Sequence, residues 1–100
     1  MTNIVDVIGV PAMLEEMAEE STELALACMK MARKLRDENP TFLQIEDIHD
    51  DLIEALSMLK ALEWLLTDET DILDAQEMHD RTNKKYRSWQ SIGLHLDLDD

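Results

Sequence analysis

Apolar residues recur at helical spacing through most of the chain, and glycine and proline hardly interrupt them. The 100 residues include only two Gly and two Pro, and Leu, Met, Ala, Glu and Asp dominate, which is a helix-forming composition. One core stripe runs from Pro11 to about Asp37 and another from Thr41 to about Leu66, both at the spacing of an amphipathic helix. We therefore predict an all-α fold, an antiparallel helical bundle of three main helices with almost no strand.

Each of the first two helices carries a second stripe beside its core stripe. The core stripes are Leu14, Met17, Ala18, Ser21, Leu24, Ala25, Cys28, Ala32 and Leu35 in the first helix, and Ile45, Ile48, Leu52, Ala55, Leu56, Leu59, Leu62 and Leu66 in the second. The second stripes are Met13, Glu16, Glu20, Glu23, Ala27 and Met31, and Asp47, Asp50, Asp51, Glu54, Met58, Ala61 and Leu65. Helices that pack on two sides in so small a domain predict a bundle completed by oligomerisation, as a homodimer or homotetramer.

The rest of the chain is assigned around these two helices as one domain, residues 1–100. Residues 1–10 alternate apolar and small polar residues and are interpreted as an extended lead-in. Thr41 and Gln44 have capping-box spacing before the second helix. Thr67 and Asp68 are suited to cap a third helix from about Glu69 to Gln90, whose apolar stripe is thin. The acidic tail, residues 94–100, is expected to be a short extended segment or disordered.

The charge of the chain restricts its partners. Twenty-three acids against nine bases give a formal charge of −14, which repels nucleic-acid phosphates and anionic lipid and favours cations. No run of residues approaches the length of an apolar membrane span, and we recognise no targeting segment. The single Cys28 is expected to be a small core residue in a cytoplasmic protein. We expect no nucleic-acid or membrane partner.

Acidic residues gather on one face of each of the first two helices. Glu16, Glu20 and Glu23 stand at i, i+4 and i+7, so like charges are stacked along one helix face. Asp47 and Asp50 repeat the pattern on the next helix, and a short connection makes the two helices antiparallel neighbours. Such a cleft of carboxylates would suit Mg²⁺ or Mn²⁺, which prefer oxygen ligands. A solvated acidic face is the alternative.

The acidic segments also resemble a known family. Residues 19–27, EESTELALA, followed by Lys30 and Arg33, are similar to the EExxELxxAxxKxxR run of MazG-like nucleoside triphosphate pyrophosphohydrolases of the phage type. Asn39-Pro40 and residues 46–50, EDIHD, resemble the loop and the EExxD segment of that family. The resemblance covers about residues 15–65. Asp47 departs from it, since the family has a Glu there and the Asp is one methylene shorter.

The resemblance implies an all-α enzyme that uses Mg²⁺ (or Mn²⁺) to hydrolyse nucleoside or deoxynucleoside triphosphates to the monophosphate and pyrophosphate. By the resemblance Glu20, Glu23, Asp47 and Asp50 would be catalytic metal ligands, with Glu16 and Glu54 as auxiliary ligands and Asp51 near by. Candidates for binding the substrate are Lys30, Arg33, Lys84 and Arg87, although Lys30 and Arg33 would equally suit a helix C-terminus. A non-catalytic helical interaction module that keeps the scaffold and a dUTPase-like relative are the alternatives.

Overall fold

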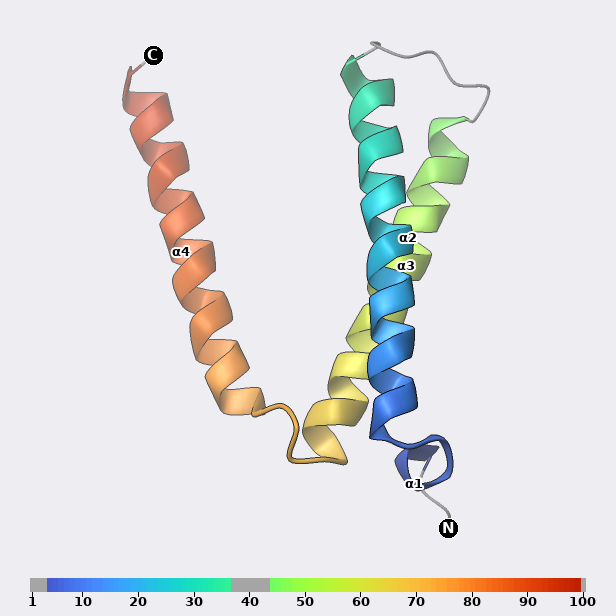
Figure 1. Cartoon of the computed structure of the whole chain (residues 1–100). Helices are drawn as coiled ribbons and strands as arrows, with labels where there is room; N and C mark the ends of the chain where they lie inside the picture. Colours follow the sequence, from blue (N-terminus) through green and yellow to red (C-terminus); the bar gives the residue numbers. More distant parts are fainter. Residues whose placement is uncertain (1–3, 37–43, 100) are drawn as a thin grey trace.

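The computed structural model describes residues 4–36 and 44–99, with side chains as far as Gly93. All regular structure in this part of the chain is helical, as the sequence predicts (Figure 1). The helices are α1 (Ile4–Ile8), α2 (Val10–Arg36), α3 (Ile45–Asp68) and α4 (Ala75–Asp99). The predicted caps at Thr41 and the Asn39-Pro40 stop lie outside the described residues.

Helices α2 and α3 form an antiparallel hairpin (Figure 1). Along α2 it is Met13 and Ala27 that are buried against α3, and both belong to the stripe that the sequence analysis ranked second. The predicted core stripe of α2 is largely exposed, because a single partner helix can cover only one face. Leu35 is 71% exposed and Leu14 43% exposed, and Cys28 is exposed as well, which corrects its assignment to the core.

The core stripe of α3 divides in the same way between buried and exposed positions. Ile48 and Leu66 are completely buried, and Ala55 and Leu62 are almost completely buried. Leu56 and Ile45, predicted in the same stripe, are 53% and 43% exposed. The hairpin therefore buries one narrow seam on each helix and leaves an apolar strip beside it.

Helix α1 closes the end of the hairpin where α2 begins and α3 ends. Val5 packs into a cluster with Met13, Leu62 and Leu66, so residues 4–8 of the predicted extended lead-in are helical and place Val5 in the core. Gly9 separates α1 from α2 with φ of +90°, a conformation that costs a glycine little. Its amide donates to the Val5 carbonyl at 2.8 Å, which ends α1.

Helix α4 begins later and ends later than predicted. Thr67 and Asp68 are the last residues of α3, so they do not cap the next helix. The cap is Asp74, whose Oδ1 accepts the backbone N–H of Glu77 at 3.0 Å. The helix then continues through Gly93 to Asp99, so the tail expected to be extended or disordered is helical up to that residue.

Helix α4 stands apart from the hairpin as a separate arm (Figure 1). The radius of gyration is 17.6 Å, against about 13 Å for a compact domain of this length. The described part of the chain is therefore mostly helical without forming a closed bundle. No helix in the described part is long and apolar enough to cross a membrane.

Candidate functional site

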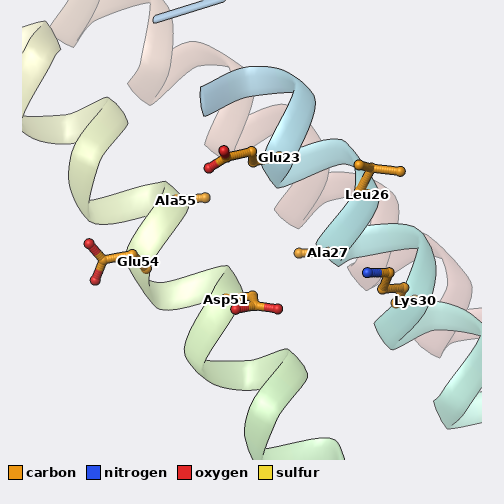
Figure 2. A pocket seen from close by; sticks show the side chains of 7 residues that line it. All are labelled: Glu23, Leu26, Ala27, Lys30, Asp51, Glu54 and Ala55. Atoms are coloured by element: carbon orange, nitrogen blue, oxygen red, sulfur yellow. The ribbon is translucent and has the colours of Figure 1, made fainter. Parts of the chain in front are cut away.

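A cleft lies on one side of the hairpin, between α2 and α3 (Figure 2). It has a volume of about 330 Å³. The small side chains of Ala27 and Ala55 are buried at its floor, where they let the two helices approach closely. The residues that line it are Glu23, Leu26, Ala27 and Lys30 of α2 and Asp51, Glu54 and Ala55 of α3.

The charged side chains of the cleft come from both helices. In Figure 2 the carboxylates of Glu23 and Asp51 and the amine of Lys30 are directed into the space between the helices. Glu54 lines the same wall, and its carboxylate is turned away from α2. Three acids and one base thus share one opening, which leaves its net charge negative and favours a cation there.

Glu20 lies beside this cleft and has a perturbed pKa. Partial burial and the nearby charge of Glu23 raise the pKa of Glu20 above its ordinary value of 4.5. A hydrogen bond with Glu23 and the charges of Glu16 and Glu54 act in the same direction. All these causes disfavour the charged form of Glu20, because its carboxylate lies among other acids.

Asp47 and Asp50 do not line the cleft. The helices are antiparallel, and the buried Ala27 and Ala55 face each other across the cleft (Figure 2). Asp47 precedes Ala55 by eight residues and Glu20 precedes Ala27 by seven, so they lie on opposite sides of that level, about 20 Å apart along the axis at 1.5 Å per residue. The sequence-based pairing of Glu20 and Glu23 with Asp47 and Asp50 thus stays a prediction, and the acids of α3 that reach the cleft are Asp51 and Glu54.

Asp51 and Glu54, which the sequence suggests as a nearby acid and an auxiliary ligand, both line the cleft. They have the same i, i+3 spacing as Asp47 and Asp50, and hence the same ability to face one direction. Each lies four residues farther from the loop than its counterpart, about one helical turn nearer to the level of Glu23. The order of the motifs in the sequence does not include this distance.

The predicted phosphate-binding cations are dispersed in the structure. Lys30 lines the cleft, whereas Arg33 is exposed one turn farther along α2. Lys84 and Arg87 are on α4, and that arm is separate from the hairpin in this chain (Figure 1). One cation of the four therefore belongs to the cleft as the single chain presents it.

Carboxylate oxygens are suitable donors for Mg²⁺, but those of the cleft do not converge. Among the described residues, no three His, Cys, Asp or Glu side chains are arranged as a ready metal site. Glu23, Asp51 and Glu54 are exposed, so rotation about their side-chain bonds is the movement by which these carboxylates would converge. Comparison of the chain with protein-family models, with curated proteins and with solved structures finds no match.

Proposed function

We propose that the protein is a Mg²⁺-dependent nucleoside or deoxynucleoside triphosphate pyrophosphohydrolase, acting in the cytoplasm as a homodimer or homotetramer. The observation that supports the proposal most is the cleft, in which acids of α2 and α3 lie together beside Glu20, whose pKa is raised by burial and by the charges of neighbouring acids. Carboxylates that repel one another in this way would be neutralised by a divalent cation. The MazG-like motif in residues 19–33 adds the reaction class by resemblance.

In this proposal the three acids that line the cleft, Glu23, Asp51 and Glu54, hold the metal, and Glu20 assists as the neighbour of Glu23. Mg²⁺ bound there would neutralise phosphate oxygens and make a bound water more acidic. Lys30 lies at the end of the cleft nearest the interhelical loop, where its amine would contact a phosphate group. Leu26 and Ala27 would supply apolar surface beside the charged groups. The carboxylates thus orient the metal, and Lys30 orients the triphosphate.

Product analysis tests the reaction. We would incubate the protein with each of the common ribonucleoside and deoxyribonucleoside triphosphates and Mg²⁺ or Mn²⁺, then separate the products. Formation of the monophosphate with pyrophosphate is the expected result. Release of orthophosphate, or no turnover of any nucleotide with either metal, would refute the proposal. Turnover confined to uracil nucleotides would identify the dUTPase-like alternative.

A non-catalytic interaction module is the second candidate, and a specific observation favours it. Large apolar side chains are exposed along every described helix, among them Leu35 on α2 and Trp64 on α3, as expected of a protein that works by contact with others. Calorimetry separates the two candidates. The enzyme binds Mg²⁺ together with a non-hydrolysable triphosphate, whereas a pure interaction module binds neither.

A further inference from the structure

Helix α4 carries an exposed aromatic stripe, which no other helix of the described residues covers. Tyr86 is 63% exposed and Trp89 73% exposed, with Ile92 on the same side. Met78 and Thr82 continue this stripe toward the start of the helix, where they line the crevice with α3. Isolated helices are marginal in water, and their stability in proteins comes mostly from packing an apolar face. This arm therefore requires a surface to pack against.

The hairpin exposes an apolar strip on the side that faces the arm. Ile53, Leu56 and Trp64 of α3 are each about half exposed, and Leu56, Lys60, Ala61 and Trp64 outline a shallow groove. The crevice at the base of the arm is lined by Trp64 and Thr67 on one side and Met78 and Thr82 on the other. Above that base the two helices diverge (Figure 1), and their apolar stripes do not meet.

Hydrogen bonds order the connection between α3 and α4. Thr70 Oγ1 donates to the Leu66 carbonyl, and the Ile72 amide donates to the Thr70 hydroxyl at 3.2 Å. Asp74 then caps α4. These bonds order the end of α3, the residues that follow it and the start of α4, so the connection has a defined local structure in the open arrangement.

The exposed area is too large for a monomer and suits a dimer. The chain exposes 8232 Å², whereas a folded monomer of its mass exposes about 5,800 Å². The excess of about 2,400 Å² per chain lies at the upper end of what obligate homodimers bury, about 1,000–2,500 Å² per subunit. A partner that covers this excess must be as large as a second hairpin with its arm.

Charge favours the pairing of arm with hairpin. From Arg81 to Gly93, α4 carries four cations and no acid, whereas α3 carries seven acids and one Lys. The acids of α4 lie outside this segment, at Glu77, Asp80, Asp97 and Asp99. The middle of one arm is thus attracted by the hairpin of another chain, while two hairpins repel. Each chain offers one arm and one hairpin, so a two-fold arrangement satisfies both surfaces and closes.

We propose that the space between α3 and α4 receives the α2–α3 hairpin of a second copy, so that two chains exchange their α4 arms in a two-fold homodimer. The aromatic stripe of each arm packs against the partner's hairpin, and the apolar strip of each α3 is covered by the partner. The inference rests on the assembly part of the proposed function, to which it gives an interface and a two-fold order, and it does not depend on the activity. The dimer can exist without catalysis, and none of the residues used below lines the acidic cleft.

Sedimentation of the full chain at micromolar concentration tests the dimer. We expect a species of twice 11.5 kDa. Trp89→Glu should weaken dimerisation by at least about 30-fold, as expected when a central interface residue is lost. Ser91→Glu adds the same charge at a position 200° around the helix from Trp89 and should leave the dimer intact. A monomeric wild type, or a Trp89→Glu variant as dimeric as Ser91→Glu, would overturn the proposal.

Mixing two defective variants tests the exchange of arms. Leu56→Glu leaves a sound arm and a damaged hairpin, whereas Trp89→Glu leaves a sound hairpin and a damaged arm. If arms are exchanged, a heterodimer of the two has one undamaged arm–hairpin contact, and mixing should restore dimers that neither variant forms alone. If each arm packs on its own chain, mixing restores nothing, and the exchange is wrong. Equal helical circular dichroism of all the chains confirms that they remain folded.

Discussion

The acidic residues of α2 and α3 differ in their position along the hairpin, and this position decides which of them could bind one metal ion together. Asp51 and Glu54 line the cleft together with Glu23, whereas Asp47 lies about 20 Å along the hairpin axis from Glu20 by its position in the helix. A ligand to Mg²⁺ must come within about 2.1 Å of the ion. The structure therefore separates two sets of acids that look alike in the sequence.

Substitution of these acids by their amides should separate the two sets. Glu54→Gln and Asp51→Asn should each lower Mg²⁺-dependent turnover at least about 100-fold, by loss of a metal ligand. Asp47→Asn, the matched control, should change it less than about threefold, because surface substitutions away from a site have small effects. Steady-state rates across a Mg²⁺ titration measure this. A severe defect in Asp47→Asn with normal Asp51→Asn would show that the motif order, and not the register, identifies the site.

The raised pKa of Glu20 has a consequence for stability against pH. The folded chain binds a proton at Glu20 more tightly than the unfolded chain does, so the folded state holds more protons between the ordinary value of 4.5 and the raised one. Stability must therefore fall as pH rises through this window. Glu20→Gln removes the ionisation, so the variant should melt higher than the wild type at neutral pH and lose this part of the pH dependence.

Thermal melting of the wild type and of Glu20→Gln from pH 4 to pH 8 tests that expectation. Glu15→Gln is the control, since Glu15 is exposed on another face of α2. Added Mg²⁺ should raise the melting temperature of the wild type by occupying the place of the proton, and should raise that of Glu20→Gln less. Equal pH slopes in the wild type and Glu20→Gln would contradict the assignment.

At the scale of elements, the seam between α2 and α3 and its junction with α1 hold the described fold together. Leu66 is completely buried in the cluster that Val5 and Met13 complete. Leu66→Ala should lower the free energy of unfolding by about 2–5 kcal/mol, the usual cost of a cavity. Val7→Ala in α1 is the control: Val7 is 66% exposed, so its truncation should cost less than about 0.5 kcal/mol. Urea denaturation measures both, and equal costs would show that α1 does not pack as described.

The start of α4 gives an independent test of the helix boundaries. Asp74→Ala should cost about 1 kcal/mol, because it leaves the Glu77 amide without its cap. Asp68→Ala, at the cap that the sequence predicts, should cost clearly less, since Asp68 ends α3. Chemical denaturation followed by helical circular dichroism compares the two. A larger loss in Asp68→Ala would place the start of α4 where the sequence analysis put it.

The sequence predicts the long helices well and their contacts less well, for identifiable reasons. The ends of α2 and α3 follow from periodicity and from the basic last turn of α2. The start of α4 was missed because Thr67, Asp68 and Asp74 are all good caps, and only hydrogen bonding selects among them. The buried face of α2 was misjudged because both of its stripes contain apolar residues, and a single-chain hairpin can bury only one.

For the candidate site, too, the sequence predicts relations within one helix better than contacts between helices. That Glu20 and Glu23 share one face can be predicted because a helix fixes their relation within a few residues, while their role stays a prediction. Their partners on α3 depend on the register of two helices, which the length of an intervening loop sets and which no local pattern records. The position of Lys30 near the acids of α2 follows from its place in the same helix. The position of Lys84 and Arg87 relative to the cleft depends on the angle between α4 and the hairpin, which the sequence does not show.

At the scale of the whole molecule, the open shape and the charge have opposing effects. The described fold leaves a strip of apolar surface on α2, α3 and α4, which favours association, while the charge of −14 opposes it through repulsion between copies. The cations of α4 reduce that repulsion where an arm contacts a hairpin. Adding salt to a solution of low ionic strength should therefore strengthen the association of two chains, because the salt screens their net repulsion.

An obligate dimer has no separate stability as a monomer, so its melting temperature must depend on protein concentration. A tenfold rise in concentration adds about 1.4 kcal/mol to the stability of a dimer. For a folding unit of two such chains, this should raise the melting temperature by about 4 °C. Calorimetry at 10-fold spaced concentrations measures the shift, and Trp89→Glu, whose dimer contact is removed, should melt at a lower temperature that does not change with concentration. A wild type whose melting temperature is independent of concentration would mean that the exposed apolar strips are covered within one chain, and the arm would then have to close onto its own hairpin.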